Sequence, residues 1–146
     1  MTNYPQPVAT MLHVKTQFEG FHCWPEAPDD VAFLRTLHRH QFGVQLTLCL
    51  PAGSTRQFEF FQVQRDLSYL CARLAAHMKH FNCMSCEDMA ARLGDTAADK
   101  PYAWREFLLS ISVSEDEENS ATVVFGNPIH EDTPAVYPGK SDQPAS

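Results

Sequence analysis

Residues 38–50, which read HRHQFGVQLTLCL, carry the most regular pattern of the chain. Apolar side chains occupy every second position; they are Phe42, Val44, Leu46, Leu48 and Leu50. This period of two predicts a β-strand with one buried face, ended by Pro51 and Gly53. His38 and His40 continue the even positions, so we expect both imidazoles at one end of the buried face.

A second strand is predicted upstream of the first. Residues 12–19 alternate between the apolar or small side chains of the even positions and the polar side chains of the odd positions. His22 continues the even positions of this segment. Because alternate residues of a strand point the same way, His22 is expected on the same apolar face, at the neighbouring end of a strand pair.

The period of the apolar side chains then changes to three or four, which predicts helices. The first helix carries Val63, Leu67, Leu70, Leu74, Met78 and Phe81 on its buried side. Ser85 begins the second, with Asp88 completing a capping box, and we expect this helix to end at Gly94. After a polar loop at 95–103, two further strands are predicted, one with Phe107, Leu109, Ile111 and Val113 on its apolar face and one through Ala121, Val123 and Phe125.

The order β-β-α-α-β-β predicts an α+β fold, in which an antiparallel four-stranded sheet packs a helix pair on one side. A length of 146 residues suits one domain. We expect that domain at residues 10–126. It would lie between a flexible N-terminus at 1–9 and a tail at 127–146 that is disordered or orders against a partner.

Composition excludes several classes of function. The net charge of −7 argues against a nucleic-acid binder that neutralises phosphates. No apolar run approaches the ~20 residues of a membrane span. Five cysteines, an odd number without framework spacing, predict reduced thiols in a cytoplasmic protein. Cys83 and Cys86 have the spacing of a ligand pair, but no second pair exists, and we interpret both as free thiols.

The three histidines suggest metal chemistry. Three neutral imidazoles and a water form an open zinc site of the catalytic type. Such a site requires side chains on one face of the sheet, and the even positions of the two strands place His22, His38 and His40 there. Glu59 or Glu115 is expected to accept a hydrogen bond from one of the rings. The alternative is a solvated loop at 38–40 beside an ordinary half-buried His22.

Glu115 continues the odd, apolar face of the third strand. A carboxylate there is costly unless it is paired or meets a ligand. The alternative is that Glu115 is the first solvated member of the acidic turn at 116–119. The sequence leaves both interpretations open.

Five short motifs, in this order, resemble those of the 6-pyruvoyl and 6-carboxy tetrahydropterin synthases. They are FEGFH at 18–22, HRH at 38–40, FEF at 58–60, SCEDMA at 85–90 and ISVSE at 111–115. The resemblance covers about residues 11–125. It implies the tunnelling fold, in which trimers join their sheets into a barrel and two rings often stack. It also implies zinc on His22, His38 and His40, and a pterin ring anchored by Glu115.

The implied substrate is dihydroneopterin triphosphate, but two catalytic positions depart from the family. Leu34 stands where the family has its catalytic cysteine, and Ala76 stands where it has the aspartate of an Asp-His pair. Cys23 is expected to point to the opposite face, which leaves no thiol nearby. His77 or His80, or a zinc-bound water, is therefore the predicted group for proton transfer.

Two functions from different classes stay open. One is a zinc-dependent synthase or lyase of the pterin or 7-deazapurine pathway. The other is a catalytically silent protein that binds or sequesters a pterin-like or purine-like ligand. A further alternative is a structural oligomer that binds no small ligand. In each case the open edges of a four-stranded sheet predict a homo-oligomer, a trimer or hexamer, without nucleic-acid or membrane partners.

Overall fold

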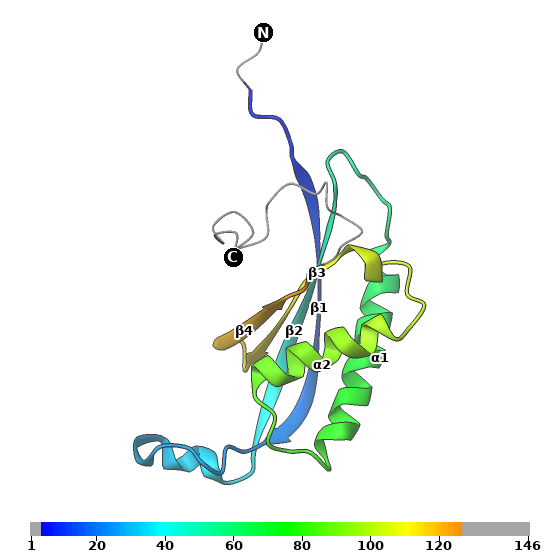
Figure 1. The fold of residues 1–146 in the computed structure, drawn as a ribbon. Coiled ribbons are helices and arrows are strands. Elements are labelled where there is room, and N and C mark those ends of the chain that lie inside the picture. The colour runs from blue at the N-terminus through cyan, green and yellow to red at the C-terminus, as the bar shows by residue number, and fades with distance from the viewer. Residues whose placement is uncertain (1–3, 127–146) are drawn as a thin grey trace, which may run out of the picture.

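The computed structural model describes residues 4–126, and in this part of the chain four strands form one antiparallel sheet (Figure 1). The strands are β1 (Ala9–His22), β2 (His38–Pro51), β3 (Leu108–Glu115) and β4 (Asn119–Val124), and they lie side by side in that order. The helices α1 (Phe60–Met78) and α2 (Cys86–Ala98) come between β2 and β3. The predicted order β-β-α-α-β-β is therefore confirmed.

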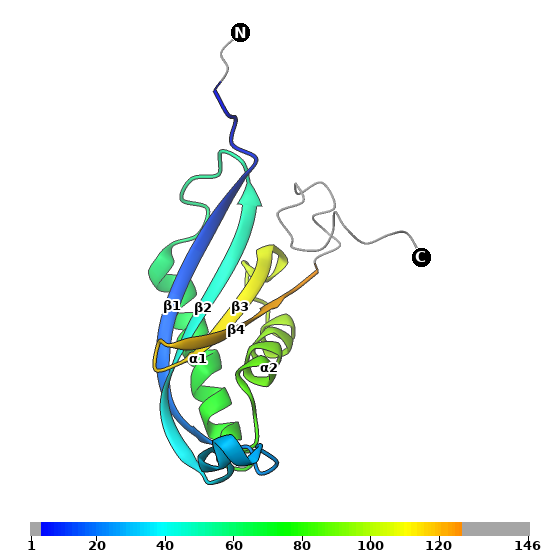
Figure 2. The same cartoon turned by 90° about the vertical axis from the view of Figure 1, so that its left-hand side faces the viewer.

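Both helices cover the same face of the sheet, as the two views in Figures 1 and 2 show. The even-numbered side chains of β1 and β2 face these helices, and Val14, Phe18, Phe42 and Leu46 are buried among them. The opposite face carries polar side chains such as Gln17 and Gln41, and neither helix of the described residues lies over it. The core is thus a single layer between sheet and helices, as the period-two pattern predicted.

The register of β1 on β2 places the histidines. The two strands pair over their whole length, with His22 opposite His38 and Gly20 opposite His40. A short 3-10 helix, Asp29–Arg35, lies in the loop that joins them. All three imidazoles are therefore carried by the same end of one strand pair.

The helix boundaries differ from the predictions in two places. The first helix ends at Met78, and Phe81, which was predicted on its buried side, is 60% exposed. The capping box of Ser85 and Asp88 is confirmed, but α2 continues through Gly94 to Ala98. A Cβ at Gly94 would overlap the ring of Phe125, so this glycine allows close packing and does not end the helix.

The third strand begins one residue later than its apolar pattern suggested. A short 3-10 helix, Arg105–Phe107, precedes it, and Phe107 is only partly buried. The pairing with β2 shifts register between Thr47 and Leu48. Consecutive residues Leu108 and Leu109 are both buried at this irregularity, which an alternating pattern does not predict.

The predicted tail at 127–146 and the first three residues lie outside the described part of the chain. Among the described residues, neither helix combines the length and the hydropathy that crossing a bilayer would require.

Candidate metal centre and adjoining pocket

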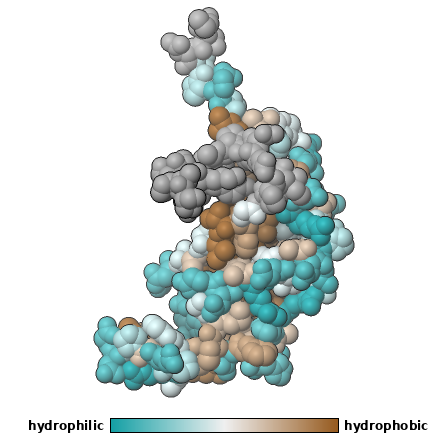
Figure 3. Space-filling view, in the orientation of Figure 1, coloured by the Kyte–Doolittle hydropathy of each residue, from teal (hydrophilic) through white to brown (hydrophobic). Residues whose placement is uncertain are grey.

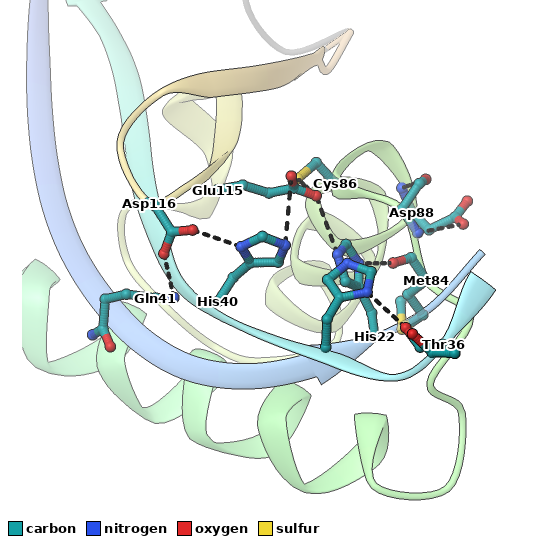
Figure 4. Close-up of polar contacts among 11 residues, drawn as sticks. His22, Thr36, His40, Gln41, Met84, Cys86, Asp88, Glu115 and Asp116 are labelled. Carbon is teal, nitrogen blue, oxygen red and sulfur yellow. Dashed lines mark hydrogen bonds and ion pairs between the residues drawn. The ribbon is translucent and has the colours of Figure 1, made fainter. Parts of the chain in front are cut away.

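Three imidazoles meet at the end of the sheet formed by the close of β1 and the start of β2 (Figure 4). His22, His38 and His40 each offer one ligand atom, and these atoms all lie within 4.8 Å of one another. Their ring centroids are 4.6 to 5.2 Å apart. The three side chains could therefore hold one metal ion, and the interpretation of residues 38–40 as a solvated loop is wrong.

Each of the three rings has an acceptor at its Nδ1 atom. This atom lies 2.8 Å from the Met84 carbonyl oxygen in His22, 2.8 Å from the Thr36 carbonyl oxygen in His38, and 2.6 Å from Asp116 Oδ2 in His40. An acceptor at Nδ1 selects the tautomer that carries its hydrogen there. The Nε2 lone pair is then the one that faces a metal, and in His22 this atom also lies 3.2 Å from Glu115 Oε1.

The Nε2 atoms of His38 and His40 are buried and have no hydrogen-bond partner within residues 4–126. Buried polar atoms are rarely left in this state unless a ligand or water completes them. Burial also lowers the pKa of His22, which favours the neutral form that coordinates metals. The donor set therefore fits a metal that accepts imidazole nitrogen.

Asp116 supplies the outer contact that was predicted for Glu59 or Glu115. Its Oδ1 atom accepts from the backbone N–H of Gln41 at 2.9 Å, while Oδ2 meets His40. The hydrogen bond from His40 is the main cause of a lowered pKa of Asp116. The Glu59 prediction is wrong because this carboxylate caps α1, where it accepts from the Gln62 N–H at 3.0 Å.

Glu115 faces the imidazoles and is not part of the solvated turn. Its Oε1 lies 3.2 Å from His22 Nε2, its Oε2 lies 3.7 Å from His40 Nε2, and its side chain is 31% exposed. The position at the end of β3, paired with Phe42 of β2, brings the carboxylate over the histidines. A carboxylate and a metal site would thus face the same small volume.

A pocket of about 550 Å³ opens beside this cluster. His22, His38 and Glu115 line it, together with Trp24 and Leu34 and with residues 83–88 at the start of α2. This volume lies within the range of about 300–1,000 Å³ that small-molecule sites occupy. Two of the three histidines, the carboxylate and an exposed tryptophan therefore converge on one ligand-sized space.

Cysteines also line this pocket, contrary to the sequence prediction. Cys23 shares the wall with His22 because β1 ends at His22, and the alternation of a strand no longer applies beyond it. Cys86 Sγ lies 3.9 Å from Glu115 Oε1, and burial, with a smaller contribution from Glu115, raises the pKa of Cys86 to about 12. The family position of the catalytic cysteine is Leu34, yet three thiols lie around the same pocket, with Cys83 as the third.

His77 and His80 lie elsewhere. His77 belongs to the last turn of α1 and stacks on Phe81 with 4.4 Å between the ring centroids, and His80 is exposed just beyond the helix. Neither is among the described residues that line the pocket of this chain. Their role in proton transfer stays a prediction.

Comparison with known proteins agrees with the fold. No protein-family model matches the chain, and no curated protein matches its sequence. Among solved structures, the chain is similar to the 6-pyruvoyl tetrahydropterin synthase of Caenorhabditis elegans, with a TM-score of 0.61 and 11% identity. The likeness covers 84% of this chain and 99% of the other. The chain therefore has the tunnelling fold, and the likeness concerns the fold alone.

Proposed function

We propose that this protein binds zinc through His22, His38 and His40 and holds a pterin-like or purine-like ligand against Glu115. The observation that carries the proposal is a cluster of three imidazoles and one carboxylate, of which His22, His38 and Glu115 line a pocket of about 550 Å³. The motif resemblance adds dihydroneopterin triphosphate as the type of substrate. The reduced thiols predicted from the cysteine count support a cytoplasmic location.

Glu115 is the proposed anchor of the ring. An ionised carboxylate has two acceptor oxygens and no donor, so it suits an edge with two adjacent N–H groups, such as a 2-amino-pyrimidinone. Both oxygens of Glu115 face the pocket side of the histidines. A ring held there would place its substituents next to the imidazole cluster.

The imidazoles supply the proposed metal centre. Bound zinc acts as a Lewis acid that polarises a substrate oxygen. The chain's own part is to hold His22, His38 and His40 in the Nδ1–H tautomer through Met84, Thr36 and Asp116. These contacts fix the orientation of the three rings, and with it the direction of the Nε2 lone pairs, before a ligand binds.

Turnover separates the proposed enzyme from the proposed binding protein. A synthase or lyase needs groups that take and return protons, and His77 and His80 are the proposed ones. Since neither lines the pocket of its own chain, this role requires a neighbouring copy that brings them to the site. One specific observation favours the binding protein. Leu34 stands at the position of the family's catalytic cysteine, and Ala76 stands at the position of its aspartate.

Zinc binding is the first test. The purified protein should contain one zinc ion per chain, and the double variant His38→Ala/His40→Ala should lose it because two of three ligands are gone. His13→Ala is the matched control, since His13 contacts Thr47 and is not one of the three clustered histidines. Elemental analysis decides the matter. Zinc that is missing from the wild type, or retained by the double variant, contradicts the proposal.

The Glu115→Gln variant tests the ligand. Hydrogen bonds to a charged group contribute about 1.5–3 kcal/mol, so affinity for pterins or guanine-like compounds should fall roughly tenfold to a hundredfold. Calorimetric titration of the zinc-loaded protein measures this, with Glu118→Gln in the exposed turn as the control. Unchanged affinity, or a loss of zinc in place of ligand, removes Glu115 as the ring anchor. Release of triphosphate from dihydroneopterin triphosphate then separates the enzyme from the binding protein.

A further inference from the structure

Two cysteine thiols meet at the wall of the pocket, outside the histidine cluster. Cys23 Sγ and Cys83 Sγ lie 4.0 Å apart, although the residues are 60 positions apart in the chain. Cys83 is exposed and Cys23 is partly exposed, whereas Cys49 and Cys71 are buried. An oxidant in solution can therefore reach this pair, while the buried cysteines are shielded from it.

Hydrogen bonds hold the two segments together on either side of the thiols. The backbone N–H of Cys23 donates to the Asn82 carbonyl at 2.8 Å, and His22 Nδ1 donates to the Met84 carbonyl at 2.8 Å. Both thiols also lie near Asn82 Oδ1, at 3.9 and 3.6 Å. The Cys23–Asn82 contact holds the backbone of Cys23 against the residue that precedes Cys83, and the two thiols would have to close from 4.0 Å to an S–S bond of about 2.05 Å.

We propose that Cys23 and Cys83 form a reversible disulfide that ties the end of β1 to the segment between α1 and α2. The oxidant is a low-molecular-weight disulfide such as glutathione disulfide. One cysteine thiolate attacks it and releases one glutathione, and the second attacks the mixed disulfide and releases another. The two cysteines lose two protons and two electrons, and glutathione disulfide is reduced to two glutathione molecules. The inference does not rest on the proposed function.

The bond would act on the pocket because both cysteines line it. It would fix the wall next to the His22–Met84 contact and close a long loop of the chain, which restricts the unfolded state. Disulfides of proteins from reducing compartments are mostly transient and redox-sensing. A reversible bond at this wall therefore links the state of the pocket to the thiol–disulfide balance around the protein.

Cys86 is the main competitor for Cys83, since the two are separated by only two residues. The structure directs the Cys86 thiol to Glu115 Oε1, at 3.9 Å, and the Cys83 thiol to Cys23. The pairing with Cys23 is thus favoured over a bond within the C-x-x-C segment.

The test uses the full chain, treated with glutathione disulfide and then alkylated. We expect the intact mass to fall by two hydrogen atoms before alkylation. Trypsin, which cuts after Lys and Arg, should then release peptide 16–35 linked to peptide 80–92. Cys86→Ser should keep this link, whereas Cys23→Ser and Cys83→Ser should lose it. Dithiothreitol should restore both thiols.

Thermal unfolding gives a second readout. Oxidation should raise the melting temperature of the wild type and of Cys86→Ser but not that of Cys23→Ser. The reason is that a Cys23–Cys83 disulfide closes a long loop of the chain, and this loop closure is what stabilises the folded state. A bond between Cys83 and Cys86, or a stable adduct with glutathione at either cysteine, overturns the inference. Protein that keeps all its thiols after prolonged exposure overturns it as well. None of these outcomes depends on zinc or on a pterin.

Discussion

The contact between His40 and Asp116 shows how one residue outside the metal ligands determines the site. Asp116 binds the ring of His40 with one carboxylate oxygen and the backbone of the next residue, Gln41, with the other. It thereby fixes both the tautomer and the orientation of the imidazole. A residue of the acidic turn is therefore a positioning group for the proposed metal centre.

Replacement of Asp116 by alanine should weaken zinc binding without abolishing it. Loss of an outer contact of this kind typically costs about 10–100-fold in metal affinity. Competition with a chromogenic chelator measures the change, and Glu118→Ala in the same turn is the matched control. Equal affinity in the two variants would show that the contact does not orient His40. A loss of zinc by both would point to disruption of the turn.

The residues of the site were predictable from the sequence to different degrees. Parity sufficed for His22, His38 and His40, because a strand pair fixes which side chains share a face. Asp116 was missed because the backbone turns at that residue, which has a φ of 51°, and period two no longer says where its side chain points. The alternation of a strand also says nothing about the three pocket thiols, since Cys23 follows the end of β1, Cys83 lies between the helices and Cys86 begins α2.

At the scale of the elements, the packing of α2 against the end of β4 depends on Gly94. This residue lies inside the helix, and Phe125 follows directly on β4 and covers it. A sequence pattern shows a glycine in a helical segment but not the ring that packs on it. The predicted end of the helix at Gly94 was wrong because the requirement comes from tertiary packing.

The Gly94→Ala variant should therefore destabilise the protein although alanine favours helices. Overpacking costs about 1–3 kcal/mol, and we expect this cost to outweigh the gain of about 1 kcal/mol in helix propensity because the added Cβ would overlap the ring of Phe125. Urea unfolding at fixed protein concentration measures the difference. In a Phe125→Ala background the same change should stabilise the protein, because the overlap is gone. Destabilisation of equal size in both backgrounds would place the conflict elsewhere.

At the scale of the whole molecule, several large hydrophobic side chains lie exposed on the surface of the chain. Large hydrophobic side chains such as Phe33, Phe61 and Phe81 are at least 60% exposed. Figure 3 shows a small group of hydrophobic residues near the middle of one face. Exposed apolar patches of this kind mark interaction surfaces. The sheet points the same way, since β1 and β4 form its two edges and neither has a second neighbouring strand within the described residues.

The protein should accordingly form a trimer or hexamer, with a mass in light scattering of at least three times the 16.5 kDa of one chain. The N–H of Phe125 donates to the Leu109 carbonyl, so the alternation of the ladder directs the N–H of Thr122 outward from β4. Thr122→Pro removes that outward donor and keeps the backbone pairing with β3; it loses the side-chain contact with Ser112, which Thr122→Val loses as well. We expect it to lower the mass towards that of one chain while the far-ultraviolet circular dichroism is kept, whereas Thr122→Val should keep the oligomer. If the wild-type protein is monomeric at micromolar concentration, the sheet edges stay open and the predicted oligomer is wrong. If the Thr122→Pro variant is folded and still oligomeric, β4 is not the edge that joins the copies.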